Sequence, residues 1–243
     1  MRLYGLLGYP LTHSFSQNYF AKKFEAESVQ DARYENFSFA SIDDLETQLF
    51  QKNNLCGFNI TIPYKKAILP FLHEQTEPVK EMGACNCVHI KDGKRIGYNT
   101  DIIGFAHSLK PFIRKHHTQA LILGTGGAAA AVEYVLRKAG IFYQFVSRAK
   151  SETTITYEEL SETIMQQYLL IINTSPVGQY PNIDEDPHLP YQYIGANHHL
   201  FDLIYNPVET KFLQLGREQG ASTQNGQEML VIQAEESWRI WNS

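Results

Sequence analysis

The fold of this chain is decided by the stretch Ala120-Leu121-Ile122-Leu123-Gly124-Thr125-Gly126-Gly127-Ala128-Ala129. Its first four residues are apolar and read as a buried strand, and the alanine-rich run from Gly127 to Ala139 reads as a helix. In such a strand, loop and helix, Gly124 allows a tight turn, Gly126 lets the backbone approach a pyrophosphate, and Ala129 permits close packing of the helix. We therefore predict a dinucleotide-binding loop, with the phosphates at the helix N-terminus, that comprises Gly124, Thr125, Gly126, Gly127 and Ala128. The alternative is a plain turn between a strand and a helix, without a ligand.

The sequence on both sides of this loop alternates between strand-like and helix-like segments. Downstream, we predict strands over 142–146, 169–172, 199–203 and 221–224, with helices near 157–167 and 209–219. Upstream, strands over 3–8, 34–39 and 56–62 alternate with helices over 17–26, from Ser41 and over 64–72. Ser41 followed by Asp44 resembles a capping box. A hairpin with strands over 87–90 and 95–98, turning at Asp92-Gly93, interrupts the alternation.

These segments predict an α/β protein with two domains. The downstream series is typical of a Rossmann-type, doubly wound parallel sheet that binds a dinucleotide. A helix over 101–115 leads into that series. The last helix, 227–243, carries apolar residues that we expect to pack back on the first half: Met229, Leu230, Ile232, Trp238 and Trp241. The N-terminal half is expected to form a second, smaller α/β domain that holds the substrate.

Composition excludes several classes of protein. The chain has 243 residues, of which 43% are hydrophobic and 19% charged, and this excludes a disordered or fibrous chain. With 21 Lys and Arg against 26 Asp and Glu, the formal charge of -5 offers no basic surface for nucleic acid. No apolar run reaches the roughly 18 residues of a membrane-spanning helix. We expect a cytoplasmic protein that binds neither membranes nor nucleic acid.

Cysteines and histidines do not form a recognisable metal site. The three cysteines lack C-x-x-C spacing, which argues against a structural zinc or a disulfide framework and favours a reducing compartment: Cys56, Cys85 and Cys87. The pairs His116-His117 and His198-His199 read as polar loop residues. We expect no metal.

The residues after the strand predicted over 142–146 concern the choice of cofactor. NAD-binding proteins usually place an acid there, on the ribose 2′-hydroxyl. This chain has Ser147-Arg148-Ala149-Lys150 instead. Because an arginine and a lysine pair with a 2′-phosphate and an acid would repel it, we predict that NADP is bound. A solvated basic turn is the alternative.

Polar side chains also cluster at strand ends in the first half. They are Ser14, Ser16, Asn59, Thr61, Lys65, Asn86, Asn99, Thr100 and Asp101. Each has a structural explanation, for example Ser16 as a helix N-cap and Asp101 as a partner of a helix dipole. Together, hydroxyls, amides, an ammonium and a carboxylate suit a small polyhydroxylated acid.

With these residues in view, the chain resembles the shikimate dehydrogenases along nearly its whole length. The resemblance in the first half rests on Ser14 and Ser16, on Asn59, Thr61, Pro63 and Lys65, on Gly83 to Asn86, and on Asn99 to Asp101. In the second half it rests on the glycine loop, on Asn173 to Gly178, on Asp202 to Pro207 and on Gly226 to Ala234. The chain departs from the family pattern at Gln17, Ala130 and Ala149, where the usual proline, basic residue and hydroxyl are missing.

The resemblance implies reversible NADPH-dependent reduction of 3-dehydroshikimate to shikimate, a step toward chorismate and the aromatic amino acids. It implies a substrate-binding and catalytic domain over 1–100, completed by helix 227–243, and an NADP-binding Rossmann-like domain over 101–226. Lys65 and Asp101 would be catalytic. Substrate contacts would come from Ser14, Ser16, Thr61, Lys65, Asn86, Asp101, Tyr205 and Gln233. Cofactor contacts beyond the glycine loop would come from Glu77, Ser147, Arg148, Lys150, Leu203 and Gly226.

Two other functions remain open on the sequence. One is a quinate/shikimate dehydrogenase that uses NAD, since Arg148 and Lys150 favour the 2′-phosphate but do not require it. The other is a non-catalytic regulator that binds a dinucleotide on the same scaffold, although the pair Lys65 and Asp101 argues against it. The sequence is compatible with a monomer or a homodimer.

Overall fold

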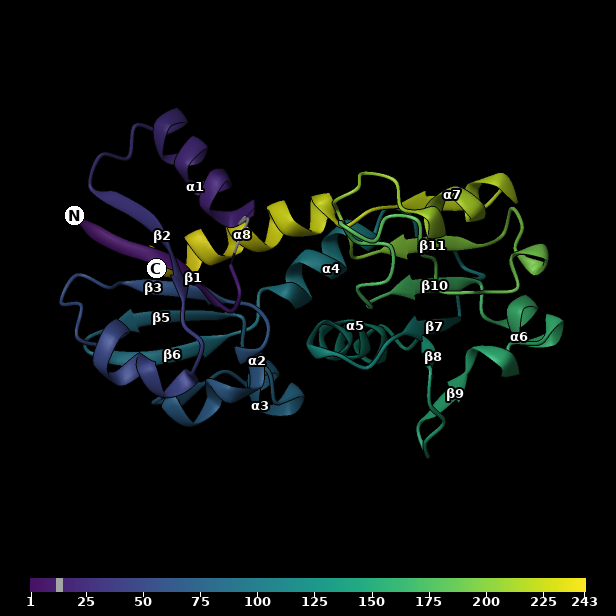
Figure 1. Cartoon of the computed structure of the whole chain (residues 1–243), viewed down its shortest axis with the longest axis horizontal. Helices are drawn as coiled ribbons and strands as arrows, with labels where there is room; N and C mark the ends of the chain where they lie inside the picture. The colour runs from purple at the N-terminus through teal and green to yellow at the C-terminus, as the bar shows by residue number, and fades with distance from the viewer. Residues whose placement is uncertain (12–14) are drawn as a thin grey trace. The chain divides into compact units, whose positions relative to one another are not determined.

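A computed structural model describes residues 1–11 and 15–243 of the chain (Figure 1). The chain forms two compact units. The first unit comprises Met1–Thr100 and Ala234–Ser243, and the second comprises Asp101–Gln233. Each contains one six-stranded sheet. The last helix, α8 (Gln227–Trp241), therefore supplies residues to both units.

The sheet of the first unit mixes parallel and antiparallel strands, in the order β2-β1-β3-β5-β6-β4. Its strands are β1 (Arg2–Gly8), β2 (Ala32–Ser38), β3 (Gly57–Ile60), β4 (Glu74–Gln75), β5 (Cys87–Lys91) and β6 (Lys94–Tyr98). Strands β5 and β6 form the predicted hairpin. Asp92 and Gly93 turn it with φ angles of 50° and 75°, the left-handed values that this kind of tight turn requires. The hairpin prediction is confirmed.

Aromatic side chains fasten the end of α8 to the first unit. Trp241 stacks on Tyr4 with ring centroids 4.8 Å apart, and its indole N–H donates to the carbonyl of Val88 at 2.9 Å. Tyr4 in turn belongs to a buried cluster with Phe20 of helix α1 (Phe15–Ala26). The expected packing of Trp241 on the first half is confirmed, whereas Met229, nearer the start of α8, belongs to a core cluster of the second unit.

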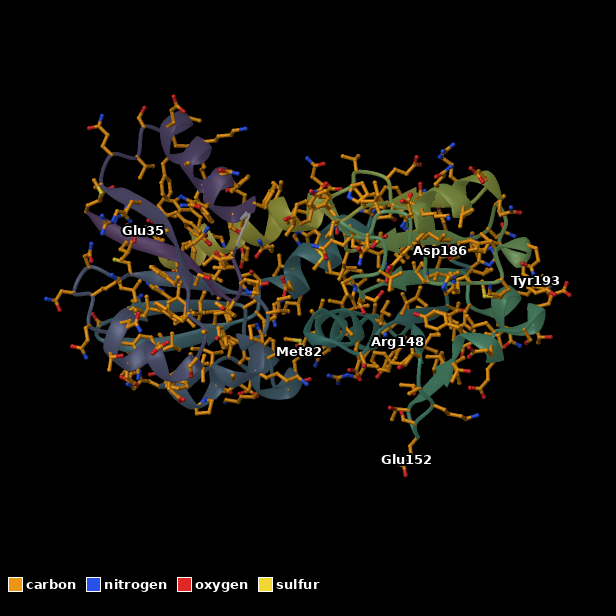
Figure 2. All side chains as sticks on the ribbon, viewed as in Figure 1. Glu35, Met82, Arg148, Glu152, Asp186 and Tyr193 are labelled. Atoms are coloured by element: carbon orange, nitrogen blue, oxygen red, sulfur yellow. The ribbon has the colours of Figure 1, made fainter. Side chains whose placement is uncertain are left out.

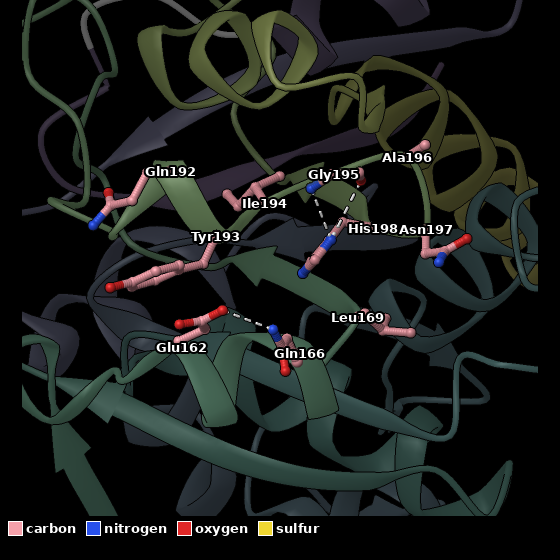
Figure 3. A pocket seen from close by; sticks show the side chains of 10 residues that line it. All are labelled: Glu162, Gln166, Leu169, Gln192, Tyr193, Ile194, Gly195, Ala196, Asn197 and His198. Carbon is pink, nitrogen blue, oxygen red and sulfur yellow. Dashed lines mark hydrogen bonds between the residues drawn. The ribbon is translucent and has the colours of Figure 1, made fainter.

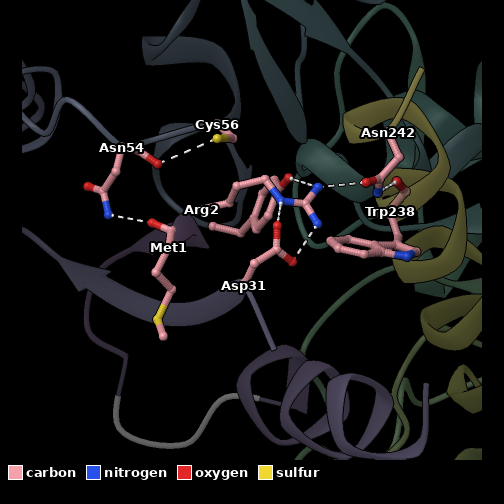
Figure 4. A network of polar contacts seen from close by, with 8 residues as sticks. Met1, Arg2, Asp31, Asn54, Cys56, Trp238 and Asn242 are labelled. Carbon is pink, nitrogen blue, oxygen red and sulfur yellow. Dashed lines mark hydrogen bonds and ion pairs between the residues drawn. The ribbon is translucent and has the colours of Figure 1, made fainter. Parts of the chain in front are cut away.

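A surface network joins β1 to the same end of α8 (Figure 4). The guanidinium of Arg2 donates to both carboxylate oxygens of Asp31, at 2.9 and 3.0 Å, and to Asn242 Oδ1 at 2.8 Å. It also lies over the ring of Trp238, 5.6 Å from the centroid. Because these contacts tie the last turn of α8 to the first strand, they hold this end of the helix in the first unit.

The sheet of the second unit is parallel throughout, in the order β12-β11-β10-β7-β8-β9. Its strands are β7 (Gln119–Leu123), β8 (Phe142–Ser147), β9 (Thr154–Thr156), β10 (Leu170–Asn173), β11 (His199–Asp202) and β12 (Ser222–Gln224). Its helices besides α8 are α4 (Asp101–Leu109), α5 (Gly127–Lys138), α6 (Glu162–Gln167) and α7 (Lys211–Glu218). The strand order reverses between β7 and β10, which is the switch point where doubly wound sheets bind ligands. The predicted fold class is confirmed.

Several predicted element boundaries are wrong. The helix predicted over 101–115 ends at Leu109, because Pro111 cannot donate a backbone hydrogen bond and restricts the residue before it. The stretch 157–167 divides into a 3₁₀ turn, Tyr157–Glu159, and α6, which Ser161 caps by accepting from the amide of Ile164. Ser41 accepts from the amide of Asp43, and the helix that follows is a 3₁₀ turn, Ile42–Asp44, and a π-helical turn, Leu45–Leu49.

The region predicted as one helix over 64–72 is also divided. It contains α2 (Tyr64–Ala67) and a 3₁₀ turn, Leu69–Phe71. Strands β4 and β9, helix α3 (Glu77–Met82) and the 3₁₀ turn Tyr191–Tyr193 had no predicted counterpart, since each is six residues or shorter and shows no clear periodicity. None of the helices described over 1–11 and 15–243 is long and apolar enough to cross a membrane.

His199 begins the strand predicted over 199–203 and is buried there, so its interpretation as part of a polar loop pair is wrong. It begins β11, is fully buried, and stacks on Phe112 with ring centroids 4.8 Å apart. Its Nδ1 lies 2.9 Å from Ser222 Oγ. Burial lowers the pKa of His199 to about 4. Its imidazole is therefore neutral in the folded protein at neutral pH.

This buried imidazole predicts a loss of stability in acid. Below its ordinary pKa of about 6.5 the unfolded chain takes up a proton that the folded chain refuses until the pH falls to about 4, so the free energy of unfolding drops in that window. Between pH 7.5 and pH 5 we expect His199 to account for a loss of about 2 kcal/mol. Urea unfolding of the wild type and of His199→Gln at both pH values measures it. The variant should lose less stability than the wild type, and equal losses would contradict the assignment.

Candidate active site

In the first unit, the strand directions bring four chain segments to one edge of the sheet. The carboxyl ends of β1 and β3 lie together, because these strands are parallel with Leu7 opposite Ile60. Strand β5 runs antiparallel to both β3 and β6, so its first residue, Cys87, lies beside the end of each. Residues that follow β1, β3 and β6, and those that precede β5, therefore share this edge. They include Ser16, Thr61, Asn86, Asn99 and Thr100.

A buried hydrogen-bond network connects these segments. Asn86 Oδ1 accepts from the amide of Thr100 at 2.6 Å, and Asn86 Nδ2 donates to Thr100 Oγ1 at 3.1 Å. Asn59 of β3 donates to Ser237 Oγ of α8 at 2.7 Å and accepts from the hydroxyl of Tyr34 at 3.0 Å. The network fixes the side chain of Asn86, which we predicted to bind substrate. Sequence reasoning missed Ser237 and Tyr34, because neither lies in a recognisable motif.

The predicted catalytic residues come from two short helical segments. Lys65 is half-buried in α2, whose first residue, Tyr64, donates its hydroxyl to the carbonyl of Phe39 at 2.6 Å. The carbonyl of Lys65 accepts from the amide of Cys85 at 2.8 Å, so the backbone that carries the lysine is held on both sides. Asp101 follows Thr100 directly and is buried as the first residue of α4.

The predicted carboxylate-binding serines are described in part. Ser16 is buried on α1. Burial raises the pKa of the Tyr34 phenol well above its usual value, and a hydrogen bond with Ser16 opposes that rise. Ser16 therefore reaches the residues of the buried network. Ser14 lies outside the described residues.

In the second unit, the glycine loop follows β7 at the switch point of the sheet. Gly124 has a φ of 101°, and a Cβ there would lie 3.2 Å from Thr174 Oγ1, so both its conformation and its surroundings favour glycine. Gly126 precedes α5 as its N-cap, and a Cβ there would meet nothing within 4 Å. Open space in front of Gly126, next to the amides of the first turn of a 12-residue helix, suits a pyrophosphate.

The loops after β10 and β11 are held together by one buried carboxyl group. Asp202, the last residue of β11, accepts from Asn173 Nδ2 at 3.1 Å, from the amide of Ile204 at 3.0 Å and from Thr210 Oγ1 at 2.6 Å. Burial raises the pKa of Asp202 to about 7, while these hydrogen bonds oppose the rise. Asp202 thus fixes the course of the chain through Leu203 and Tyr205. Sequence reasoning noted its motif but did not assign it a role.

Gly226 packs directly against that loop. Its amide donates to the carbonyl of Ile204 at 2.9 Å, and a Cβ on it would lie 2.1 Å from the carbonyl oxygen of Leu203. Since backbone atoms cannot yield to such a contact, the position requires glycine. Leu203, Tyr205 and Gly226, all predicted site residues, therefore lie close together at the carboxyl ends of β11 and β12. Gln233, further along α8, is buried and donates to the carbonyl of Leu230 at 3.2 Å.

The basic residues after β8 interact with neighbouring side chains. Lys150 forms an ion pair with Glu159, a residue of the 3₁₀ turn after β9. Arg148 is exposed at the carboxyl end of β8, labelled in Figure 2. Burial raises the pKa of the Tyr157 phenol and the charge of Arg148 opposes that rise, so the guanidinium acts near Tyr157. The remaining predicted cofactor residue, Glu77, begins α3 in the first unit and pairs with Lys80 at 2.6 Å.

A hollow of about 340 Å³ in the second unit lies at the other edge of the sheet (Figure 3). It is lined by Leu169, which precedes β10, and by Asn197 and His198, which precede β11. Because all strands are parallel, these amino ends lie opposite the glycine loop. His198 accepts from the amide of Gly195 at 3.0 Å and bonds the carbonyl of Met165 at 2.9 Å, so its ring serves the local structure. Across residues 1–11 and 15–243, no three His, Cys, Asp or Glu side chains are grouped to hold a metal ion.

Comparison with known proteins points to one family. Residues 6–88 match the family model of the shikimate dehydrogenase substrate binding domain. A shikimate dehydrogenase (NADP(+)) of Methanococcus maripaludis strain C6 is 36% identical over 264 residues, with 99% of this chain and 91% of the relative covered.

Solved structures of similar proteins agree over the whole chain. The shikimate 5-dehydrogenase of Thermus thermophilus, in complex with NADP(H) and shikimate, matches with a TM-score of 0.87 at 28% identity, covering 99% of this chain and 93% of that one. A shikimate 5-dehydrogenase of Listeria monocytogenes, in complex with shikimate and NAD, matches with a TM-score of 0.88 at 25% identity, covering 100% and 92%. The two complexes hold different nicotinamide cofactors.

Proposed function

The chain belongs to the shikimate dehydrogenase family, and on that premise we propose that it catalyses the reversible NADPH-dependent reduction of 3-dehydroshikimate to shikimate. The observation that carries the proposal is full-length similarity at 36% identity to a shikimate dehydrogenase (NADP(+)). The described geometry supports it, because the first unit gathers hydroxyl and amide groups at one sheet edge and the second carries a glycine loop at its switch point.

The residues of the second unit fit a dinucleotide. The open space at Gly126 and the amides that begin α5 suit the pyrophosphate, and Arg148 and Lys150 suit a 2′-phosphate. Leu203 and Gly226, which pack against one another, are proposed to contact the nicotinamide end, and Glu77 is a further proposed cofactor residue. Bound NADPH supplies the hydride for the reduction.

The first unit is proposed to hold the substrate. Ser14 and Ser16 bind the carboxylate of shikimate, and Thr61, Lys65 and Asn86 bind its ring hydroxyls. Three residues of the second unit are also proposed substrate contacts: Asp101, Tyr205 and Gln233. The buried network around Asn86 supports this assignment, since it holds that amide in one orientation. Within residues 1–11 and 15–243 the thiols of Cys56, Cys85 and Cys87 are not joined in disulfides, which suits a reducing compartment such as the cytoplasm.

Lys65 is proposed to act where negative charge develops. As hydride reaches the carbonyl carbon, its oxygen becomes an alkoxide, which the ammonium of Lys65 stabilises and then protonates. We propose Asp101 as the second catalytic residue, which orients that ammonium. In the reverse direction Lys65 takes the proton from the hydroxyl of shikimate, as microscopic reversibility requires.

Replacing either carboxylate-binding serine should weaken substrate binding while leaving turnover nearly unchanged. The carboxylate is remote from the reacting carbon and is bound alike before and during hydride transfer, so Ser16→Ala and Ser14→Ala should raise KM for shikimate about tenfold with little change in kcat. Ser243→Ala provides a control on an exposed serine at the other end of the described chain, whose hydroxyl donates to the carbonyl of Ile240. Steady-state kinetics at saturating NADP⁺ measure the effect, and an unchanged KM would remove that serine from the site.

The proposed function is tested by comparing four pairs of substrate and cofactor. Purified protein is assayed with shikimate or quinate, each with NADP⁺ or NAD⁺, by the absorbance of the reduced cofactor. We expect the highest kcat/KM with shikimate and NADP⁺. Preference for quinate or for NAD⁺ would favour the quinate/shikimate dehydrogenase alternative, and no turnover with any pair would contradict the proposal.

A further inference from the structure

The proposed 2′-phosphate site contains a negative charge that sequence reasoning missed. Lys150, one of its two cations, is paired with the carboxylate of Glu159. The other oxygen of that carboxylate, Oε2, accepts from the backbone amide of Thr156 at 2.8 Å. Because one oxygen is held by the backbone, the second is fixed in the position where it meets the lysine.

The segment that carries the lysine is held as well. Thr154 Oγ1 donates to the carbonyl of Ala149 at 3.0 Å and lies 2.9 Å from Ser151 Oγ, so the loop between β8 and β9 is internally hydrogen-bonded. Strand β9, which precedes Glu159 in the sequence, pairs in parallel with β8. Ser147 lies opposite Thr156 in this pairing. Lys150 and the amide of Thr156 together hold the pKa of the Glu159 carboxyl below its usual range, so it is charged at neutral pH.

We propose that Glu159 is a specificity-determining residue, which weakens the preference for NADP over NAD by holding the ammonium of Lys150 and by placing a carboxylate beside the 2′-phosphate. The inference rests on the proposed function. With Lys150 held by Glu159, Arg148 is the main residue that recognises the 2′-phosphate.

The charges of the two cofactors explain why the effect is selective. A phosphate monoester carries roughly -1.5 to -2 at neutral pH, whereas the ribose 2′-hydroxyl of NAD is uncharged. To bind the phosphate, Lys150 must leave Glu159 or share its protons between two anions. The carboxylate also repels the phosphate directly. Neither cost arises for NAD.

The test is direct binding of NADP⁺ and NAD⁺ by titration calorimetry, without turnover. Glu159→Gln keeps an acceptor for the Thr156 amide and removes the charge. We expect NADP⁺ to bind about three- to tenfold more tightly to this variant, a change of the size that one exposed ion pair gives, with NAD⁺ unchanged. Glu152→Gln is the matched control, since Glu152 lies at the outer tip of the same loop (Figure 2). It should alter neither affinity.

A double-mutant cycle with Lys150→Ala separates the ion pair from general charge effects. In the wild type, where Glu159 holds the lysine, Lys150→Ala should lower the affinity for NADP⁺ by no more than about threefold. In the Glu159→Gln background the same substitution should lower that affinity by about tenfold. Additive effects of the two substitutions, or equal gains from Glu159→Gln and Glu152→Gln, would overturn the inference. Nucleotide binding without oxidation of shikimate would instead contradict the proposed function and leave this result standing.

Discussion

Lys65→Ala should lower kcat by about 100-fold or more and change the affinity for shikimate much less. The lysine's main contribution comes as charge develops on the oxygen of the reacting carbon, which is absent in the bound ground state. Its proposed substrate contact in the ground state is one among several proposed contacts, so KM should rise only a few-fold. Steady-state kinetics together with an equilibrium measurement of shikimate binding check both parts.

Two further substitutions sharpen this experiment. Lys66→Ala removes the neighbouring exposed lysine of the same short helix and should leave kcat near the wild-type value. Lys65→Arg keeps the positive charge but gives up a proton far less readily, so it separates charge stabilisation from proton transfer. If Lys65→Ala keeps a kcat near that of the wild type, the lysine is not the proton donor.

Arg148→Ala should lower the affinity for NADPH by about 10- to 150-fold and leave the affinity for NADH nearly unchanged. The guanidinium is proposed to meet the 2′-phosphate, and each charge-assisted hydrogen bond contributes about 1.5–3 kcal/mol. Because Glu159 already pairs with Lys150, the second cation compensates poorly for the loss of the first. Fluorescence titration of both reduced cofactors measures the two affinities.

Lys115→Ala is the control for a lost surface cation, since Lys115 precedes β7 and so lies toward the amino ends of the strands. It should change neither affinity. Equal losses of NADPH and NADH in Arg148→Ala would mean that the arginine supports the adenine or the loop and does not recognise the phosphate.

The sequence was most informative where local chemistry decides the conformation. The run from Ala120 to Ala129 predicts strand, glycine turn and helix, and Gly124 indeed has a φ of 101° in that turn. Asp92-Gly93 likewise predicts a hairpin that forms with both residues at positive φ. In each case only a few residue types adopt the required backbone angles readily, so the sequence pattern predicts the local structure.

What the sequence could not reveal depends on partners distant along the chain. Asn59 donates a hydrogen bond to Ser237, which lies 178 residues away in the sequence, and no motif near either residue predicts this pairing. The sequence placed His199 in a strand, but its burial depends on packing against residues distant along the chain, such as Phe112. The signal for Glu159 was present, since Thr156 followed three residues later by a glutamate is a helix-start pattern. Its pairing with Lys150 nevertheless depends on β9 lying beside β8.

The central claim is that this chain transfers a hydride from NADPH to 3-dehydroshikimate. The most direct measurement is incubation of the purified protein with 3-dehydroshikimate and NADPH that carries deuterium at the transferable position of the nicotinamide, followed by mass spectrometry of the product. Two samples of NADPH are prepared, each with deuterium on one face of the nicotinamide ring. One of the two should give shikimate that holds deuterium on the newly reduced carbon. Shikimate without label from both cofactors, or no shikimate at all, would contradict the account.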